Sequence, residues 1–373
     1  MTVPVHIERL RLRLVRLPLV AFFETSFGRI YDRTFIIVHV DGDGVEGLGE
    51  CVTDVDPYYS PETNVTAWHV MKDFLAPLVL GRSFAHPRDV FRAFARVRGH
   101  NMAKAAIEMA VWDLAARAEN ARLSRLLGGT RREIASGVSI GIQDSLDELA
   151  RKVEQELSAG YRRIKIKIKP GWDLSAVETV RSRFGAIPLM VDANAAYSLA
   201  QADLLASLDA FDLMMIEQPL EYEDIRDHAV LQRRIRTAIC LDESIHTPRL
   251  AEEAIALGAC RIINIKPGRL GGFEQSIRVH DVCASHGVPV WHGGMLESGI
   301  GRAHNIHLAS LPNFTLPGDI AASRRYFVPD LIEPAIAVSP TGTIPVPEGA
   351  GIGVHVDWER IEAATVERYE VRA

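Results

Sequence analysis

Basic and acidic residues recur at a nearly constant interval through the middle of the chain. Lys167, Asp192, Glu217 and Asp242 follow one another at steps of 25 positions, and Lys266 follows Asp242 after 24 positions. Each of these residues ends a short apolar run. Three carboxylates held together repel one another unless a cation lies between them. Carboxylate oxygens without histidine or cysteine favour a hard ion, so the array predicts a site for Mg2+ or, second, Mn2+.

The two lysines that bracket the carboxylates predict acid–base chemistry. A lysine acts as a base only when its pKa falls well below the reference value of about 10.4. Nearby positive charge lowers that pKa. Lys165 lies two residues from Lys167, and Arg269 lies three residues from Lys266, with the metal expected between the two lysines. The expected reaction is removal of a proton α to a metal-bound carboxylate, which produces an enolate-like anion.

A charged residue at a strand end can also be solvated or cap the next helix. The segment 164–169 argues for a site, because its alternation directs Ile164, Ile166 and Ile168 to one face and the lysines to the other. An exposed edge strand alternates in the same way. Here the strand belongs to a run of parallel units that helices should cover, so inward lysines would be costly without a function.

The elements that position this array form a repeating pattern over residues 131–324. Short apolar runs alternate with amphipathic stretches such as 145–158, 174–183 and 248–257, which indicates a parallel sheet with helical crossovers. Eight such units predict an α/β fold of the (β/α)8 barrel type, with room for one atypical unit. The eight runs are IASGVSIGI, YRRIKIKIKPG, IPLMVDAN, FDLMMIEQP, AICLDES, CRIINIKPG, VPVWHGGM and NFTLPGD.

Residues 1–130 mix strand and helix patterns and predict an α+β unit. Alternation over 5–17 favours a strand, and the run 34–40 with Asp41-Gly42-Asp43-Gly44 and VEGLGECV predicts a hairpin. Helical periodicity follows over 64–80, 89–97 and 102–127, where Gly128-Gly129 ends the last helix. Two strand-like runs in the segment 325–373 are expected to return to this unit.

Composition narrows the range of partners. The net charge of the 373 residues is -6 and no block of like charges occurs, which argues against nucleic acid or an anionic membrane as a partner. No run of about 18 apolar residues is present, and the first residues do not resemble a signal peptide. The four scattered cysteines are expected to be free thiols in a reducing compartment, so we expect a cytoplasmic protein. Those cysteines are Cys51, Cys240, Cys260 and Cys283.

Several motifs of the barrel segment resemble the enolase superfamily. They are KIKIKPGWD, VDANAAY, MMIEQPL, CLDES, INIKPGRLGG and GGMLESGIGRAHNIHLASLPNFTLPGD. Within it the chain is similar to the muconate-lactonizing subgroup, and most to the N-acylamino acid racemase / o-succinylbenzoate synthase family. The similarity extends over nearly the whole chain, including PLVAFFETSFG near the start. It implies a modified barrel covered by an N-terminal capping domain, 1–130, which the segment 325–373 completes.

The resemblance also implies roles for individual residues. Asp192, Glu217 and Asp242 match the metal ligands, and Lys167 and Lys266 match a pair of acid/base lysines. In a racemase each lysine would deprotonate one enantiomer. In a synthase of the menaquinone pathway, Lys167 would remove the α-proton and assist loss of hydroxyl while the charge of Lys266 stabilises the dienolate. The implied substrate-pocket residues are Ser139, Lys165, Asn194, Gly294, Met295, Leu296 and Phe23, the last in a mobile loop after the first strand.

Other residues depart from that pattern or remain ambiguous. Asp54 stands where similar proteins carry an apolar residue. His292 takes the place of a frequent cysteine, and Ile320 that of a frequent threonine. These three departures leave open which substrate side chain the pocket prefers. Glu243 would orient Lys266 or the metal shell, or simply be solvated. His292 is either a pocket donor or packed behind the pocket. Two further histidines three residues apart favour a structural role, since no third ligand of their type is close in sequence; these are His304 and His307.

The sequence also bears on several alternative functions. A zinc amidohydrolase would need an HxH motif, which the sequence lacks, and a Schiff-base aldolase would leave the three carboxylates unexplained. A mandelate-type enzyme would carry a His–Asp pair in place of Lys266, and a dipeptide epimerase usually shows DxD where this chain has Gly318-Asp319-Ile320. A cycloisomerase and a non-catalytic binding barrel also stay open. The expected partner is a small carboxylate substrate, with the chain itself forming a homo-oligomer.

Overall fold

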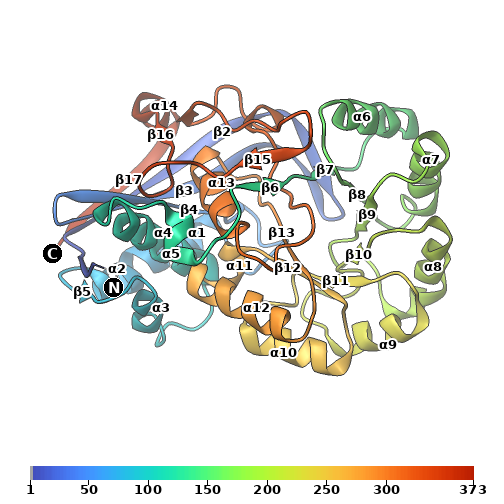
Figure 1. Ribbon diagram of the computed structural model, residues 1–373, viewed down its shortest axis with the longest axis horizontal. Coiled ribbons are helices and arrows are strands. Elements are labelled where there is room, and N and C mark those ends of the chain that lie inside the picture. The colour runs from blue at the N-terminus through green and yellow to red at the C-terminus, as the bar shows by residue number, and fades with distance from the viewer. Residues whose placement is uncertain (1–2) are drawn as a thin grey trace.

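The structure is a computed structural model that describes residues 3–373. A four-stranded antiparallel sheet in the order β17-β2-β3-β4 underlies the first unit (Figure 1). The predicted hairpin is confirmed, because Asp43 and Gly44 adopt positive φ in the turn between β3 and β4, as tight hairpin turns require. The strands of this sheet are β2 (Arg9–Thr25), β3 (Gly28–Gly42), β4 (Val45–Cys51) and β17 (Thr365–Arg372).

Helix α4 (Asn101–Ala118) is buried on nearly all sides because it lies between this sheet and the barrel. Gly47 and Gly49 of β4 permit the close approach, since a Cβ at either position would collide with backbone oxygens of α4. The helix predicted over 102–127 is interrupted after Ala118, where Asn120 takes a left-handed conformation. The remaining elements are β1 (Val5–His6), α1 (Asn64–Val70), the π-helix η1 (Met71–Leu75), α2 (Ala76–Val79), β5 (Ser83–Phe84), α3 (Asp89–Ala93) and α5 (Leu123–Leu127).

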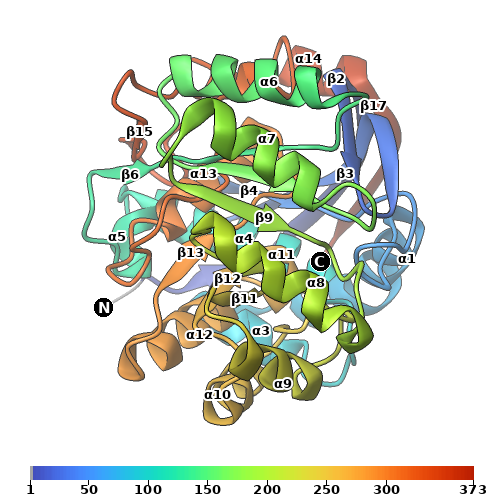
Figure 2. The same ribbon diagram turned by 90° about the vertical axis from the view of Figure 1, so that its right-hand side faces the viewer.

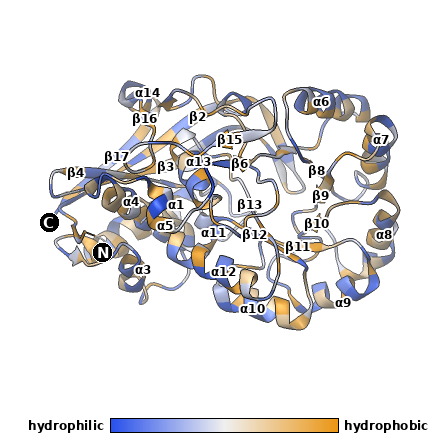
Figure 3. Ribbon diagram, viewed as in Figure 1, coloured by the Kyte–Doolittle hydropathy of each residue, from blue (hydrophilic) through white to orange (hydrophobic). Residues whose placement is uncertain are grey.

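Seven parallel strands form the curled sheet of the second unit, in the sequential order β7 to β13. The barrel fold predicted from the repeating pattern is therefore confirmed. Figure 2 shows α6 to α10 beside one another on its outer face, and Figure 3 shows that these helices carry both hydrophobic and hydrophilic residues. The strands are β7 (Val138–Ile140), β8 (Ile164–Lys167), β9 (Leu189–Asp192), β10 (Ile216–Glu217), β11 (Ile239–Leu241), β12 (Ile262–Ile265) and β13 (Val290–His292).

Helices connect these strands in the order expected for a barrel. They are α6 (Leu146–Ser158), α7 (Leu174–Phe184), η2 (Leu199–Gln201), α8 (Ala202–Ser207), η3 (Leu208–Phe211), α9 (Arg226–Arg234), α10 (Pro248–Leu257), α11 (Pro267–Leu270), α12 (Phe273–Ser285), α13 (Gly299–Leu308) and η4 (Ser323–Arg325). In residues 3–373 no helix is both long and apolar enough to cross a membrane.

The eighth predicted strand, NFTLPGD, is wrong as a regular strand. Two isolated parallel bridges, Val290 to Phe314 and Ser136 to Gly318, take its place between β13 and the segment before β7. Pro317 lies between the two bridging residues and has no N–H to donate to a ladder, which explains the irregularity.

The C-terminal segment contacts both units. Strand β17 pairs along β2, whereas β15 (Thr343–Pro345) pairs with β6 (Glu133–Ala135) at the start of the barrel. The remaining elements here are β14 (Ile332–Glu333), β16 (His355–Val356) and α14 (Trp358–Ala364). The boundaries predicted for the two units, 1–130 with 325–373 and 131–324, stay a prediction.

Two buried glutamates of the capping unit bind helix N-termini of the barrel. Glu108 of α4 accepts hydrogen bonds from the backbone N–H groups of Phe273 (2.8 Å) and Glu274 (3.0 Å), in the first turn of α12. Glu50 of β4 accepts in the same way from Ser298 at the start of α13, at 3.0 Å. The first turn of a helix leaves backbone N–H groups without a partner in the helix, and the oxygens of these two side chains accept from them, which joins the two units.

Candidate active site between the capping unit and the barrel rim

The recurring acidic and basic residues lie at one rim of the barrel. Asp192 is paired in register with Lys167 on one side and with Glu217 on the other. Asp242 directly follows β11, and Lys266 directly follows β12. Parallel strands bring their carboxyl ends to the same edge, so constant spacing along the chain becomes proximity in the fold.

The lysines of this rim are buried and bonded to the carboxylates. Lys167 Nζ lies 2.6 Å from Asp192 Oδ2 and 2.6 Å from Asn194 Oδ1. Lys165 Nζ lies 3.0 Å from Asp192 Oδ2 and 2.8 Å from Glu217 Oε2. Both lysines are therefore in the barrel lumen, as the alternation of the strand predicts.

Lys266 is held on the other side of the rim. Its Nζ donates to Asp242 Oδ2 at 2.6 Å and to the hydroxyl of Tyr59 at 3.0 Å. The Tyr59 hydroxyl in turn donates to Asp242 Oδ1 at 3.1 Å. Arg269, expected to act on Lys266, forms an ion pair with Asp242 and donates to the carbonyl oxygen of Ile245.

The two lysines have opposite pKa shifts. Burial lowers the pKa of Lys167, and the attraction of Asp192 only partly offsets it. Burial acts in the same direction on Lys266, but Tyr59, Glu217 and Glu243 outweigh it and raise the pKa of that lysine. The expectation that positive neighbours lower both pKa values is thus wrong for Lys266. For Lys167 the direction is confirmed, although burial contributes more than the neighbouring lysine.

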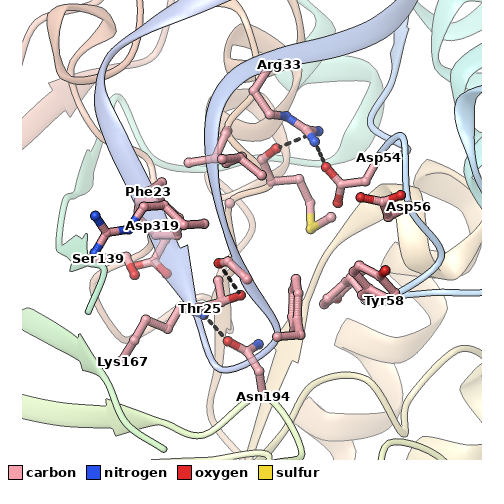
Figure 4. A pocket seen from close by; sticks show the side chains of 18 of the residues that line it. Phe23, Thr25, Arg33, Asp54, Asp56, Tyr58, Ser139, Lys167, Asn194 and Asp319 are labelled. Atoms are coloured by element: carbon pink, nitrogen blue, oxygen red, sulfur yellow. Dashed lines mark hydrogen bonds and ion pairs between the residues drawn. The ribbon is translucent and has the colours of Figure 1, made fainter. Parts of the chain in front are cut away.

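A cavity of about 220 Å3 opens between the rim and the capping unit (Figure 4). Both Lys167 and Lys266 line it, as do all seven residues expected in the substrate pocket. The capping unit contributes its β2–β3 hairpin and the loop after β4. The lining residues are Phe23, Thr25, Phe27, Gly28, Arg29, Ile30, Arg33, Asp54, Val55, Asp56, Tyr58, Tyr59, Ser139, Lys165, Lys167, Asn194, Lys266, Gly294, Met295, Leu296, Asp319 and Tyr326.

One expected pocket residue lies in a different element than predicted. Phe23 belongs to β2 and pairs with Ile30 of β3, so it is not in a loop after the first strand. The hairpin extends past the sheet and places Phe23 edge-on to Tyr326, with ring centroids 6.5 Å apart. The run of leucine and phenylalanine that ends β2 prolongs the strand, because aromatic and branched side chains fit a pleated surface.

Several lining residues were not found from the sequence. Asp319 Oδ2 lies 2.5 Å from Lys165 Nζ, and its Oδ1 lies 2.6 Å from Arg163 Nη1. Its place at the end of the eighth apolar run was an available signal, since Asp192 ends the third run in the same way. Tyr59 and Arg33 come from the capping unit, and no spacing pattern connects them with the barrel residues.

The ambiguous residues have defined surroundings. Glu243 Oε1 accepts from Asn194 Nδ2 at 3.0 Å rather than contacting Lys266. His304 Nδ1 bonds the carbonyl of Ile300, and His307 lies between Ser124 N and the carbonyl of Ile352, which confirms their structural role. His292 and Ile320 are both buried, and neither lines the cavity.

Comparison with known proteins identifies the family. Residues 10–128 match the family described as mandelate racemase / muconate lactonizing enzyme, N-terminal domain, and residues 148–360 match the enolase C-terminal domain-like family. The chain is 51% identical to o-succinylbenzoate synthase of Geobacillus kaustophilus over 97% of this chain and 96% of that protein. The chain belongs to the o-succinylbenzoate synthase / N-succinylamino acid racemase family of the enolase superfamily. It is therefore an enzyme.

Two further similarities agree with this family. N-succinylamino acid racemase of Thermus thermophilus is 48% identical over 98% of this chain and 99% of its own length. A solved enolase-superfamily structure from Listeria innocua superposes with a TM-score of 0.95 at 40% identity and covers 99% of both chains. Enzymes of this family act on small carboxylates, and those of the superfamily bind a divalent metal.

The rim offers oxygen ligands that suit such a metal. Asp192, Glu217 and Asp242 are almost completely buried, and among the described residues their hydrogen-bond and ion-pair partners include no histidine or cysteine. Glu243 Oε2 and Asn264 Oδ1 lie buried beside them with no hydrogen-bond partner in residues 3–373. The rim therefore holds more buried side-chain oxygens than its hydrogen-bond donors satisfy. Hard oxygen ligands of this kind fit Mg2+ or Mn2+.

A second group of possible ligands lies elsewhere. Within residues 3–373, the possible ligand atoms of His39, Asp41 and Glu46 all lie within 4.8 Å of one another. Those of the three rim carboxylates do not lie this close together. Arg11 Nη2 lies 2.8 Å from both His39 Nε2 and Asp41 Oδ1. The guanidinium of Arg11 thus lies against the ligand atoms of this group on the capping sheet. The rim carboxylates likewise have cations beside them, the ammonium groups of Lys165 and Lys266.

Proposed function

We propose that this enzyme transfers protons at a carbon α to a carboxylate through an enediolate intermediate. It would racemise N-acyl, in particular N-succinyl, amino acids, dehydrate the menaquinone precursor to o-succinylbenzoate, or do both. One observation carries the proposal: Lys167 ends β8 and Lys266 directly follows β12, two strands that three others separate, and yet both lysines line one cavity. A substrate α-carbon between them would be accessible from two faces. The names of the similar proteins support the same chemistry.

The residues of the rim divide this work. Asp192 and Asn194 hold the ammonium group of Lys167 at one face, and Asp242 with Tyr59 holds that of Lys266 at the other. In racemisation, one lysine takes the α-proton and the other returns a proton to the opposite face. Lys266 could act as a base only with its raised pKa brought down, and the positive charge of a bound divalent metal beside it would act in that direction. In dehydration, Lys167 takes the proton and then assists loss of hydroxyl, while Lys266 stays charged.

Asp192, Glu217 and Asp242 would hold the metal. Mg2+ is the favoured ion and Mn2+ the second choice, and Co2+ is a further alternative. When bound, the metal supplies positive charge that polarises the substrate carboxylate and stabilises negative charge on its oxygens. Lys165, bonded to two of these ligands and to Asp319, would add charge on the same side. Ser139 Oγ is buried, lines the cavity and has no partner within residues 3–373, so it would donate to the substrate.

The test is exchange of the α-proton in D2O, followed by NMR, with N-succinyl amino acids and with the o-succinylbenzoate precursor. Lys266→Ala should abolish racemisation but retain exchange of the enantiomer that Lys167 deprotonates, and Lys167→Ala should do the converse. Lys152→Ala on α6, outside the cavity, is the matched control. Full racemisation by Lys266→Ala would refute the two-base mechanism. Comparing kcat/KM for the two substrates would decide which reaction dominates.

Location and assembly stay predictions of this proposal. The four cysteines are buried and free, which favours a reducing compartment and so the cytoplasm. A homo-oligomer without nucleic acid or membrane partners remains the expectation.

A further inference from the structure

One wall of the cavity carries two carboxylates from the loop after β4, Asp54 and Asp56. Figure 4 shows them beside Tyr58, across the cavity from Lys167 and from Ser139. The lysine side of the cavity is suited to a substrate carboxylate. The opposite wall therefore faces whatever substituent the substrate carries away from its reacting carbon.

The charge of Asp54 is matched within the wall. It forms an ion pair with Arg33, a residue only 3% exposed. The same guanidinium donates to the carbonyl oxygens of Val52 and Met295, each at 3.2 Å. Arg33 is therefore committed to protein groups and is not free to bind an anionic substituent.

Asp56 has no such partner. It is exposed and forms no hydrogen bond or ion pair within the described part of the chain, 3–373. The other nearby cation in the lining, Arg29, is bonded to Glu24 at 2.6 Å and to Asp144 at 2.5 Å. The wall thus has one carboxylate more than its cations neutralise.

Two aromatic rings border the same wall. Phe27 and Tyr58 both line the cavity, with ring centroids 6.4 Å apart. Their faces suit the apolar stem of a long side chain, and aromatic faces also attract cations. A carboxylate beside aromatic rings is an environment that favours a positively charged group over a negatively charged one.

We propose that this wall selects substrates with a positively charged side chain, so that N-acyl derivatives of arginine-like or lysine-like amino acids are preferred. The proposal rests on the proposed function. The substrate carboxylate lies at the rim, the α-carbon lies between the two lysines, and the side chain extends to Asp56. An anionic substituent at this wall meets uncompensated negative charge and is disfavoured.

The test compares two substrates of nearly equal shape, N-succinyl-L-arginine and N-succinyl-L-citrulline, which differ in side-chain charge. We expect kcat/KM for α-proton exchange to favour arginine by about two- to fivefold, the range of an exposed ion pair. Asp56→Asn, which keeps the shape and removes the charge, should bring the ratio close to one. Asp203→Asn, an exposed aspartate on α8, is the control and should leave the ratio unchanged. Raising the salt concentration should also reduce it.

Three outcomes separate the two proposals. Equal rates for both substrates, or a preference that Asp56→Asn leaves intact, would overturn the selectivity while citrulline exchange still supports the reaction. Absence of exchange with either substrate would overturn the reaction and the selectivity together. Asp54→Asn provides an independent check, because it frees Arg33 and should raise the relative rate of N-succinyl-L-glutamate.

Discussion

Replacing Tyr59 by phenylalanine tests whether the capping unit contributes to the proton transfer. The Tyr59 hydroxyl accepts from Lys266 Nζ at 3.0 Å and donates to Asp242 Oδ1 at 3.1 Å. Phenylalanine keeps the ring, whose centroid lies 4.4 Å from Lys266 Nζ, so only the hydroxyl is lost. A buried hydrogen bond to a charged group contributes about 1.5–3 kcal/mol. Loss of correct placement of Lys266 should therefore slow racemisation by about 10- to 150-fold.

The assay follows both loss of optical rotation and α-proton exchange in D2O. Because two enantiomers have equal free energies, racemisation must slow by the same factor from either side. Exchange of the enantiomer that Lys167 deprotonates should change little, since Lys167 does not contact Tyr59. Tyr31→Phe, an exposed residue of β3 outside the cavity, is the control. Racemisation within about threefold of wild type would refute the placement role, and equal slowing of exchange at both faces would point to general distortion.

Three further predictions follow from the buried charges. Asp319→Asn should lower the free energy of unfolding in urea by about 3 kcal/mol and raise KM, because it leaves Lys165 and Arg163 buried with one counter-ion fewer. Burial raises the pKa of Glu108 to about 8 from the usual 4.5, so its stabilising contribution is full below pH 4.5 and is lost as the pH rises through 8. Glu108→Gln cannot ionise, so its stability relative to wild type should rise by up to about 1.4 kcal/mol per pH unit in that window, measured by urea unfolding; parallel pH curves would contradict this. Chelation by EDTA should abolish activity and Mg2+ or Mn2+ should restore it, and full activity after chelation would exclude the predicted metal role.

Local sequence signals predicted the regular elements well where periodicity was strong. The helix α10 has the predicted bounds, and the turn at Asp43-Gly44 forms the predicted hairpin. The eighth run failed as a strand because Pro317 interrupts hydrogen bonding, although its apolar pattern matches the others. The family resemblance implied a loop for Phe23, and the local pattern did not correct it, because it does not reveal that β2 and β3 extend beyond their sheet.

The sequence by itself determined which groups gather at the barrel rim. Parallel strands end at one edge, so residues spaced by one β/α unit, such as Lys167 and Asp192, must become neighbours. Only the tertiary structure decided what surrounds them. Tyr59 lies more than 200 residues from Lys266 along the chain, yet together with nearby carboxylates it reverses the shift that burial alone would impose on the pKa of that lysine. Such contacts depend on how the two units pack against each other, which no periodicity within either unit encodes.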